Sequence, residues 1–155
     1  MSTQTLEQTR AKFAYKCVEK IANDSQDTIP KKKFKGLVKK TPTYILTNGL
    51  GNTLAFLFSK GNKEHLALAY IIGKYLFSEN EYTAKIFNGP RNIFDNELSQ
   101  FVNDNNELKF QLRDILFRNL VFKNTEKYIL ATEETLRLLN WLKRFVEAMI
   151  EGEEE

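Results

Sequence analysis

Residues 43–60 read TYILTNGLGNTLAFLFSK, a run of large apolar residues that NGLGN interrupts in the middle. An Asn-Gly pair between hydrophobic stretches is the strongest short-range signal for a β-hairpin, and two glycines in three residues also resemble a phosphate-binding loop. The apolar residues do not alternate as hairpin strands require; they step by four, four, three and one, at Leu46, Leu50, Leu54, Leu57 and Phe58. The spacing therefore predicts one helix over about 42–60. Gly49 and Gly51 lie inside it, and each lowers the stability of the helix by about 1 kcal/mol relative to alanine.

The rest of the chain repeats the helical period and shows no alternation of strands with helices. The predicted fold class is all-α, a compact single-domain bundle of about six to seven helices over residues 1–155, with flexible residues 1–4 and an acidic tail at 151–155. The first predicted helix covers about 5–23 and begins with a capping box formed by Thr5 and Gln8. A short helix around Phe34, Leu37 and Val38 is predicted to end before Thr41-Pro42. The other predicted helices cover 63–77, 92–103, 105–122 and 132–149. Asn88-Gly89 is predicted to be a turn, and Thr132 is predicted to cap the last helix, with Glu133 and Glu134 in its first turn.

Composition limits the chemistry that this chain can carry. Cys17 and His65 are the only cysteine and histidine, so an intramolecular disulfide is impossible and a structural zinc site lacks ligands. No stretch approaches the roughly 18 uncharged apolar residues of a membrane helix, and the N-terminus lacks the apolar core of a signal peptide. We expect a cytoplasmic protein with no membrane partner.

No catalytic apparatus is visible in the sequence. The glycines at 49 and 51 fit neither the dinucleotide fingerprint nor the phosphate-loop pattern, which needs Gly-Lys-Ser/Thr. His65 has no nucleophile or metal partner nearby, and Cys17 lies on an apolar helix face, where a buried structural thiol is expected. We predict no catalytic residue, no metal site, no cofactor and no small-molecule substrate. The alternative is an enzyme with an unrecognised site among its carboxylates.

Charge is unevenly distributed along the chain. Residues 1–60 carry 11 Lys/Arg and 4 Asp/Glu, giving +7, whereas residues 61–155 carry 12 and 16, giving −4. The segment KKKFKGLVKK at 31–40 holds six lysines and no acid, while the chain ends in EGEEE. Such a lysine block suits a polyanion, although a solvated helix face is the commoner explanation of a charge run.

Three stretches carry a resemblance to a known family. They are RAKFAYKCV at 10–18, KTPTYILTNGLGNTLAFLFSK at 40–60 and YILATEETLRLLNWLKRFVEAM at 128–149. In these stretches the chain resembles the small subunit of the type III-B CRISPR RNA-silencing effector, the Cmr complex. Residues 61–127 carry no motif that aligns with the family.

The resemblance implies a small, helical, non-catalytic subunit of a ribonucleoprotein that acts in antiviral defence. Its partners would be the other Cmr subunits, further copies of itself stacked in a short filament, and the guide RNA–target RNA duplex, whose path its basic face would line. Cleavage of the target would belong to the backbone subunits. The alternative is an assembly subunit whose basic face binds neighbouring protein subunits rather than RNA.

The expected RNA contacts are basic side chains from two segments: Lys31, Lys32, Lys33, Lys35, Lys39, Lys40, Lys143 and Arg144. The resemblance supports Lys40, Lys143 and Arg144 by position, whereas Lys31 to Lys35 rest on charge alone. Lysine and arginine suit this task because the guide reads the sequence and the protein only needs to neutralise the backbone.

The glycines receive a structural explanation. A glycine inside a helix lets a neighbouring element approach the helix axis. We expect Gly49 to accept the helix that carries Asn140 and Trp141, with Asn48 supplying a hydrogen bond at that contact.

Overall fold

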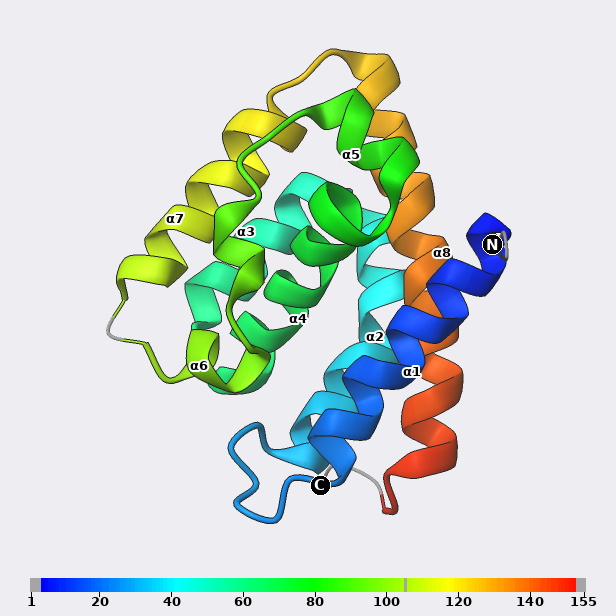
Figure 1. Cartoon of the computed structure of the whole chain (residues 1–155), viewed down its shortest axis with the longest axis vertical. Coiled ribbons are helices and arrows are strands. Elements are labelled where there is room, and N and C mark those ends of the chain that lie inside the picture. The colour runs from blue at the N-terminus through cyan, green and yellow to red at the C-terminus, as the bar shows by residue number, and fades with distance from the viewer. Residues whose placement is uncertain (1–3, 105, 153–155) are drawn as a thin grey trace.

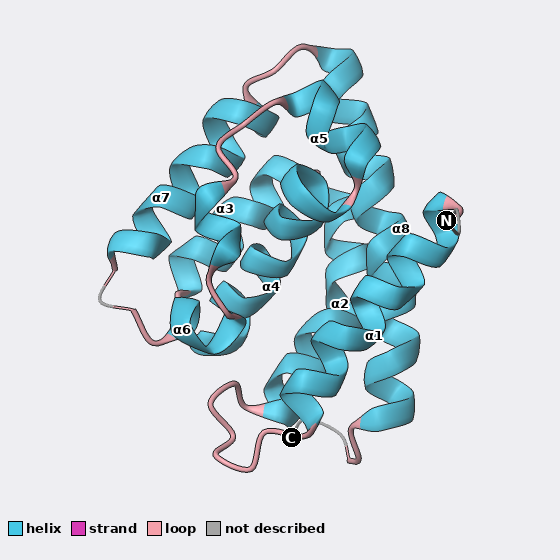
Figure 2. Ribbon diagram, in the orientation of Figure 1, coloured by secondary structure: helices cyan, strands magenta, loops and turns pink. Residues whose placement is uncertain are grey.

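Helices form all the regular structure in the described residues, 4–104 and 106–152, of this computed structural model (Figures 1 and 2). The α-helices of this part of the chain are α1 (Leu6–Ala22), α2 (Lys31–Asn48), α3 (Leu50–Lys60), α4 (Lys63–Lys74), α5 (Glu81–Phe87), α6 (Leu98–Val102), α7 (Glu107–Leu116) and α8 (Thr125–Met149). A π-helical turn η1 (Tyr75–Glu79) continues α4, a 3-10 turn η2 (Asn92–Asp95) precedes α6, and a π-helical turn η3 (Phe117–Val121) continues α7. The all-α prediction is confirmed, with eight α-helices where six to seven were expected. Most of the predicted flexible start and acidic tail, residues 1–3 and 153–155, lies outside the described residues.

Helix α4 is the centre of the fold. Every residue from Leu66 to Gly73 is buried, as expected of a helix that is apolar on all sides. Helices α2, α3, α6 and α7 pack around it, and α8 packs along both α1 and α2 (Figure 1). The buried apolar side chains of these helices form one continuous core.

Helix α1 begins where the sequence predicts. The Thr5 hydroxyl accepts a hydrogen bond from the Gln8 amide (3.1 Å), and the Gln8 side chain accepts one from the Thr5 amide (2.9 Å). The predicted capping box is therefore confirmed, and it satisfies two amides that the helix itself leaves without acceptors.

The predicted boundary between the second and third helices is wrong. Helix α2 runs through Pro42 to Asn48, and the chain breaks instead at Gly49, whose φ of +88° and ψ of 160° are essentially restricted to glycine. Leu46, which supported a helix continuing through Gly49, is 75% exposed and lies outside the apolar face. The regular apolar spacing across the Asn-Gly pair was therefore coincidental.

The predicted start of the last helix is also wrong. Helix α8 begins at Thr125, and the side chain of Asn124 caps it by accepting a hydrogen bond from the Lys127 amide (3.0 Å). Thr132 lies inside the helix and donates to the Tyr128 carbonyl. Glu133 and Glu134 are thus not first-turn acids, and the helix dipole does not explain them.

Two other predictions have different outcomes. At the expected turn Asn88-Gly89, Asn88 ends α5 in the left-handed conformation with φ of +47°, but residues 88–91 form no turn. The single helix expected over 92–103 is instead the 3-10 turn η2 followed by α6, with extended backbone at Asn96 and Glu97 between them.

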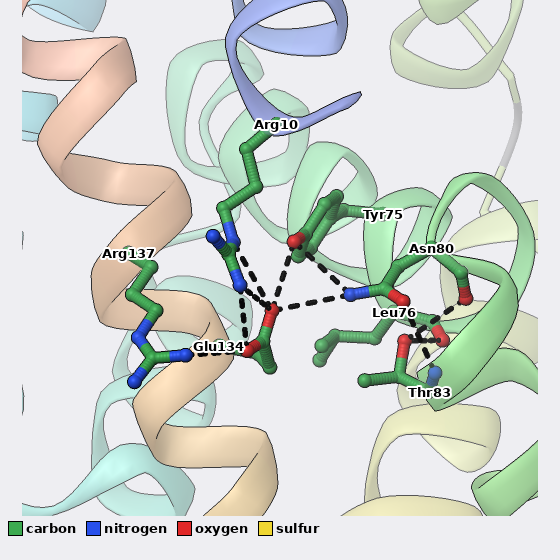
Figure 3. Close-up of polar contacts among 7 residues, drawn as sticks. All are labelled: Arg10, Tyr75, Leu76, Asn80, Thr83, Glu134 and Arg137. Atoms are coloured by element: carbon green, nitrogen blue, oxygen red, sulfur yellow. Dashed lines mark hydrogen bonds and ion pairs between the residues drawn. The ribbon is translucent and has the colours of Figure 1, made fainter. Parts of the chain in front are cut away.

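A buried polar network joins α1, η1 and α8 (Figure 3). The Arg10 guanidinium donates to both carboxylate oxygens of Glu134, each at 2.9 Å. The Tyr75 hydroxyl (2.9 Å) and the Asn80 amide (3.1 Å) donate to the same carboxylate, and Arg137 reaches it from the surface at 3.2 Å. Because this ion pair lies in the interior with its lone pairs satisfied, it fixes how the three elements meet.

Candidate nucleic-acid interface

Helix α2 begins with an unusual accumulation of positive charge. Pro30 precedes it without a side-chain cap, Lys31, Lys32 and Lys33 form its first turn, and that turn contains no acid. Cations at a helix N-terminus oppose the helix dipole, at about 0.3–1 kcal/mol each, whereas an anion is favoured there. This end of α2 is therefore a region of concentrated positive potential.

Lys31 is engaged by the preceding loop. Its ammonium donates to the Asp24 carbonyl (3.0 Å) and lies 3.8 Å from the Asp27 carboxylate. Backbone amides of Gln26 and Thr28 donate to the Asp24 carboxylate and hold its pKa below the usual value. Lys31 thus ties the loop to the start of α2, and its charge is partly offset there.

The prediction for Lys35 requires a correction. Lys35 is 5% exposed, and its ammonium donates at 2.7 Å to the backbone carbonyl of Ile150, the residue that ends α8. Burial on a backbone carbonyl removes this charge from the surface. Lys35 holds α2 and the end of α8 together and is not part of the basic face.

The other four lysines of the segment form what we call the basic strip: Lys32, Lys33, Lys39 and Lys40. Seven residues separate Lys32 from Lys39 and Lys33 from Lys40, which corresponds to two helical turns, or about 10 Å along the axis. Lys32, Lys33 and Lys40 are exposed, and Lys39 is half-buried. The strip lies opposite the buried face of α2, which includes Val38.

A shallow hollow of about 560 Å³ lies at the start of α2. Lys31, Lys32 and Lys33 line it, together with the carboxylate residues Asp27 and Glu151. The two acids offset part of the positive potential inside the hollow, so the outward part of the strip is the more basic surface.

The second predicted basic group lies at the same end of the molecule. Helices α2 and α8 are antiparallel. The Tyr128 hydroxyl near the start of α8 accepts a hydrogen bond from the Gly51 amide, just past the end of α2 (2.8 Å). At the other end of α8, the Ile150 carbonyl accepts one from Lys35 in the first half of α2. Lys143 and Arg144 are exposed on the last turns of α8. They therefore lie toward the same end of the antiparallel pair as the first half of α2.

The glycine contact involves a different residue from the one expected. A Cβ at Gly49 would lie 3.4 Å from the Tyr128 hydroxyl, and one at Gly51 would lie 3.0 Å from Val121 and 3.4 Å from Tyr128. Helix α8 is the correct neighbour, but the contact lies twelve residues before Asn140. Because the two elements approach closely, the Gly51 amide of α3 can donate a hydrogen bond to the Tyr128 hydroxyl.

The remaining residues of the expected glycine motif do not meet at that contact, and this prediction is wrong. Asn48 is exposed and donates within its own helix to the Tyr44 carbonyl (3.3 Å). Asn140 is exposed, and Trp141 stacks on Phe145 with ring centroids 5.8 Å apart. Asn48 and Asn140 lie toward opposite ends of the antiparallel pair of helices.

Cys17 and His65, whose side chains could act as a nucleophile or bind a metal, both pack against other parts of the fold. Cys17 is buried, and burial raises the pKa of its thiol to about 12, which confirms the expected structural thiol. His65 is half-buried, with its ring edge against Phe56 (5.7 Å) and beside the Glu64 carboxylate (3.6 Å). Among residues 4–104 and 106–152, no three His, Cys, Asp or Glu side chains converge in a way that could hold a metal ion.

One basic group was missed in the sequence. Lys12, Lys16 and Lys20 recur every four residues along α1 and are exposed, and Lys74 at the end of α4 lines the same cleft as Lys16 and Lys20. The four-residue spacing was a usable signal, because it places three lysines on one ridge of a helix. Acidic residues elsewhere in the segment lower its net charge, so a count of net charge does not reveal these three lysines.

Two further observations concern the chain as a whole. None of the helices in the described part of the chain is long and apolar enough to cross a bilayer. Residues 6–149 match the family model described as CRISPR-associated protein (Cas_Cmr5). The match runs from the first residue of α1 to the last residue of α8, and it includes residues 61–127, which show no motif that aligns by inspection.

Proposed function

The chain belongs to the Cas_Cmr5 family and is a small subunit of the type III-B CRISPR (Cmr) complex; from this premise we propose that its basic strip contacts RNA in the assembled complex. The proposed ligand is the backbone of the guide RNA–target RNA duplex. In this proposal the subunit is non-catalytic and is present in several copies along the duplex.

The observation that carries the proposal is the position of the basic strip. Its lysines lie on the first half of a helix whose first turn contains no acid, and Lys143 and Arg144 lie toward the same end of the molecule on α8. Phosphate contacts need charge and reach rather than base recognition, and lysines on an exposed helix face supply both. Lys35 is not part of the proposal because its ammonium is buried on a backbone carbonyl.

The test is target-RNA binding by the reconstituted complex at several salt concentrations. Lys32→Glu together with Lys33→Glu should lower the affinity and flatten its salt dependence, because each lost phosphate contact removes about 0.7–0.9 from the slope of log K against log[salt]. Lys63→Glu with Lys85→Glu is the matched control, since both lysines are exposed, lie outside the strip and change the net charge equally.

Sizing the complex with and without RNA separates the proposal from a protein-binding role for the strip. If the strip binds RNA, the complex of the strip variant should assemble normally and fail only in RNA binding. If the variant fails to assemble before RNA is added, the strip meets an acidic surface of a neighbouring subunit and the RNA proposal is wrong.

A further inference from the structure

A cleft of about 100 Å³ lies between α1, the end of α4 and α6, away from the basic strip. Its floor is apolar, with Phe13 and Cys17 from α1, Tyr70 and Ile71 from α4, and Leu98 from α6. The Tyr70 hydroxyl is already engaged, because it donates to the backbone carbonyls of Ile93 in η2 and of Asn96 just after it. The floor thus offers apolar contact and few polar partners.

The rim of this cleft is basic. Lys16 and Lys20 of α1 and Lys74 of α4 line it, with Glu79 as the acidic residue among the lining side chains. Lys20 is paired with Glu97 at 2.8 Å. No hydrogen bond or ion pair joins the ammonium groups of Lys16 and Lys74 to a residue that the structure describes, although Lys74 contributes electrostatically to the lowered pKa of Glu97. Two positive charges therefore border the apolar hollow without a direct bond to an acid.

The size and lining of the cleft decide what it can hold. A cavity of roughly 150 Å³ accommodates benzene, so this smaller hollow is too small for a nucleobase but suits a branched aliphatic side chain. A base would also bring polar edges against a floor that cannot pair them, which is unfavourable. An aliphatic side chain has no such groups, and carboxylates on either side of it would reach Lys16 and Lys74.

We propose that this cleft binds an acidic segment of another protein, which inserts one leucine, isoleucine or valine side chain between α1, α4 and α6. A single buried anchor surrounded by complementary charge is how compact protein contacts gain affinity and orientation. The surface is separate from the basic strip, so the inference stands whether or not the strip binds RNA.

The experiment is an NMR titration of the isotope-labelled full chain with the blocked peptide Asp-Glu-Leu-Glu-Asp. Saturable shifts are expected at Cys17, Ile71 and Leu98. They should be lost when serine or tryptophan replaces the peptide leucine. Lys16→Glu with Lys74→Glu should weaken binding at least tenfold, and Lys16→Gln with Lys74→Gln should weaken it less, because the charge is removed but not reversed.

The matched control is Lys63→Glu with Lys85→Glu, which should bind the peptide as the unaltered chain does. Equal binding of the serine peptide, shifts confined to other surfaces, or no effect of the Lys16 and Lys74 substitutions would overturn the proposal. It would also be overturned if a uridine 12-mer shifted the cleft residues more strongly than the peptide. Self-association of the chain that the Lys16 and Lys74 substitutions abolish would also overturn the proposal, because the occupant would then be a second copy.

Discussion

Removing one partner of the buried Arg10–Glu134 pair should cost far more stability than removing the charge from both. Arg10 is 7% exposed and Glu134 is 2% exposed, and two bonds of 2.9 Å join the guanidinium to the two carboxylate oxygens. Breaking a buried ion pair on one side leaves an uncompensated charge and costs about 3–5 kcal/mol. For a chain of this size that corresponds to roughly 6–20 °C in melting temperature.

A double-mutant cycle measures this coupling. Arg10→Met leaves the Glu134 carboxylate with only the exposed Arg137 as a cation, and Glu134→Gln leaves the Arg10 guanidinium without its anion. The double variant keeps a side-chain oxygen at position 134 that can accept from Tyr75 and Asn80, so no charge is buried and the donors retain a partner. Urea unfolding should give a coupling free energy of about 2–3 kcal/mol.

An exposed pair supplies the control for this cycle. Lys20 and Glu97 lie at a similar distance, 2.8 Å, but their side chains are 59% and 62% exposed. Water and salt screen such a pair, so Lys20→Met with Glu97→Gln should show a coupling below about 1 kcal/mol. If the Arg10 and Glu134 effects add within about 0.5 kcal/mol, the network does not join the three elements as we infer.

Three other predictions concern single residues. Gly49→Ala should destabilise the chain by about 1–3 kcal/mol in urea unfolding because of the φ of +88°, and an unchanged free energy of unfolding would contradict this. Lys35→Met should cost about 1–3 kcal/mol by leaving the Ile150 carbonyl without its donor, yet leave RNA affinity of the complex unchanged; lost affinity at full stability would refute the structural role. Because the pKa of the Cys17 thiol is raised from 9.0 to about 12, the unfolded chain releases this proton first, so its contribution to stability should fall as pH rises above about 9. Serine at position 17 should reduce that alkaline loss, and rapid reaction of the folded thiol with Ellman's reagent at pH 8 would contradict its burial.

Local signals in the sequence were enough for the fold class and for part of its detail. The capping box at Thr5 and the helix end at Asn88 depend on neighbouring residues, so the sequence contains the information needed to predict them. The break at Gly49 is different: a helix period passes through it, and the Tyr128 hydroxyl that accepts from the Gly51 amide just after the break comes from far along the chain. At Pro42 the local signal predicted a helix boundary that does not exist. Proline normally ends a helix, but α2 continues through Pro42.

The candidate site shows the same division between local and distant causes. The concentration of lysines in α2 is visible in the sequence, but nothing in it separates Lys35 from Lys33. Burial of Lys35 depends on Ile150, 115 residues later. Glu134 resembled a residue that merely complements the helix dipole, because its partner Arg10 lies 124 residues earlier. The roles of Lys35 and Glu134 are therefore determined by contacts between residues far apart in the sequence.

The salt dependence of target-RNA binding tests the central claim most directly. In the reconstituted complex, Lys32→Glu with Lys33→Glu should reduce the magnitude of the slope of log K against log[salt] by about 1.4–1.8 for each copy that contacts the duplex, because each copy loses two phosphate contacts. Lys63→Glu with Lys85→Glu should leave the slope unchanged. If the strip variant assembles fully and keeps both the affinity and the slope of the unaltered complex, the basic strip of α2 does not contact RNA.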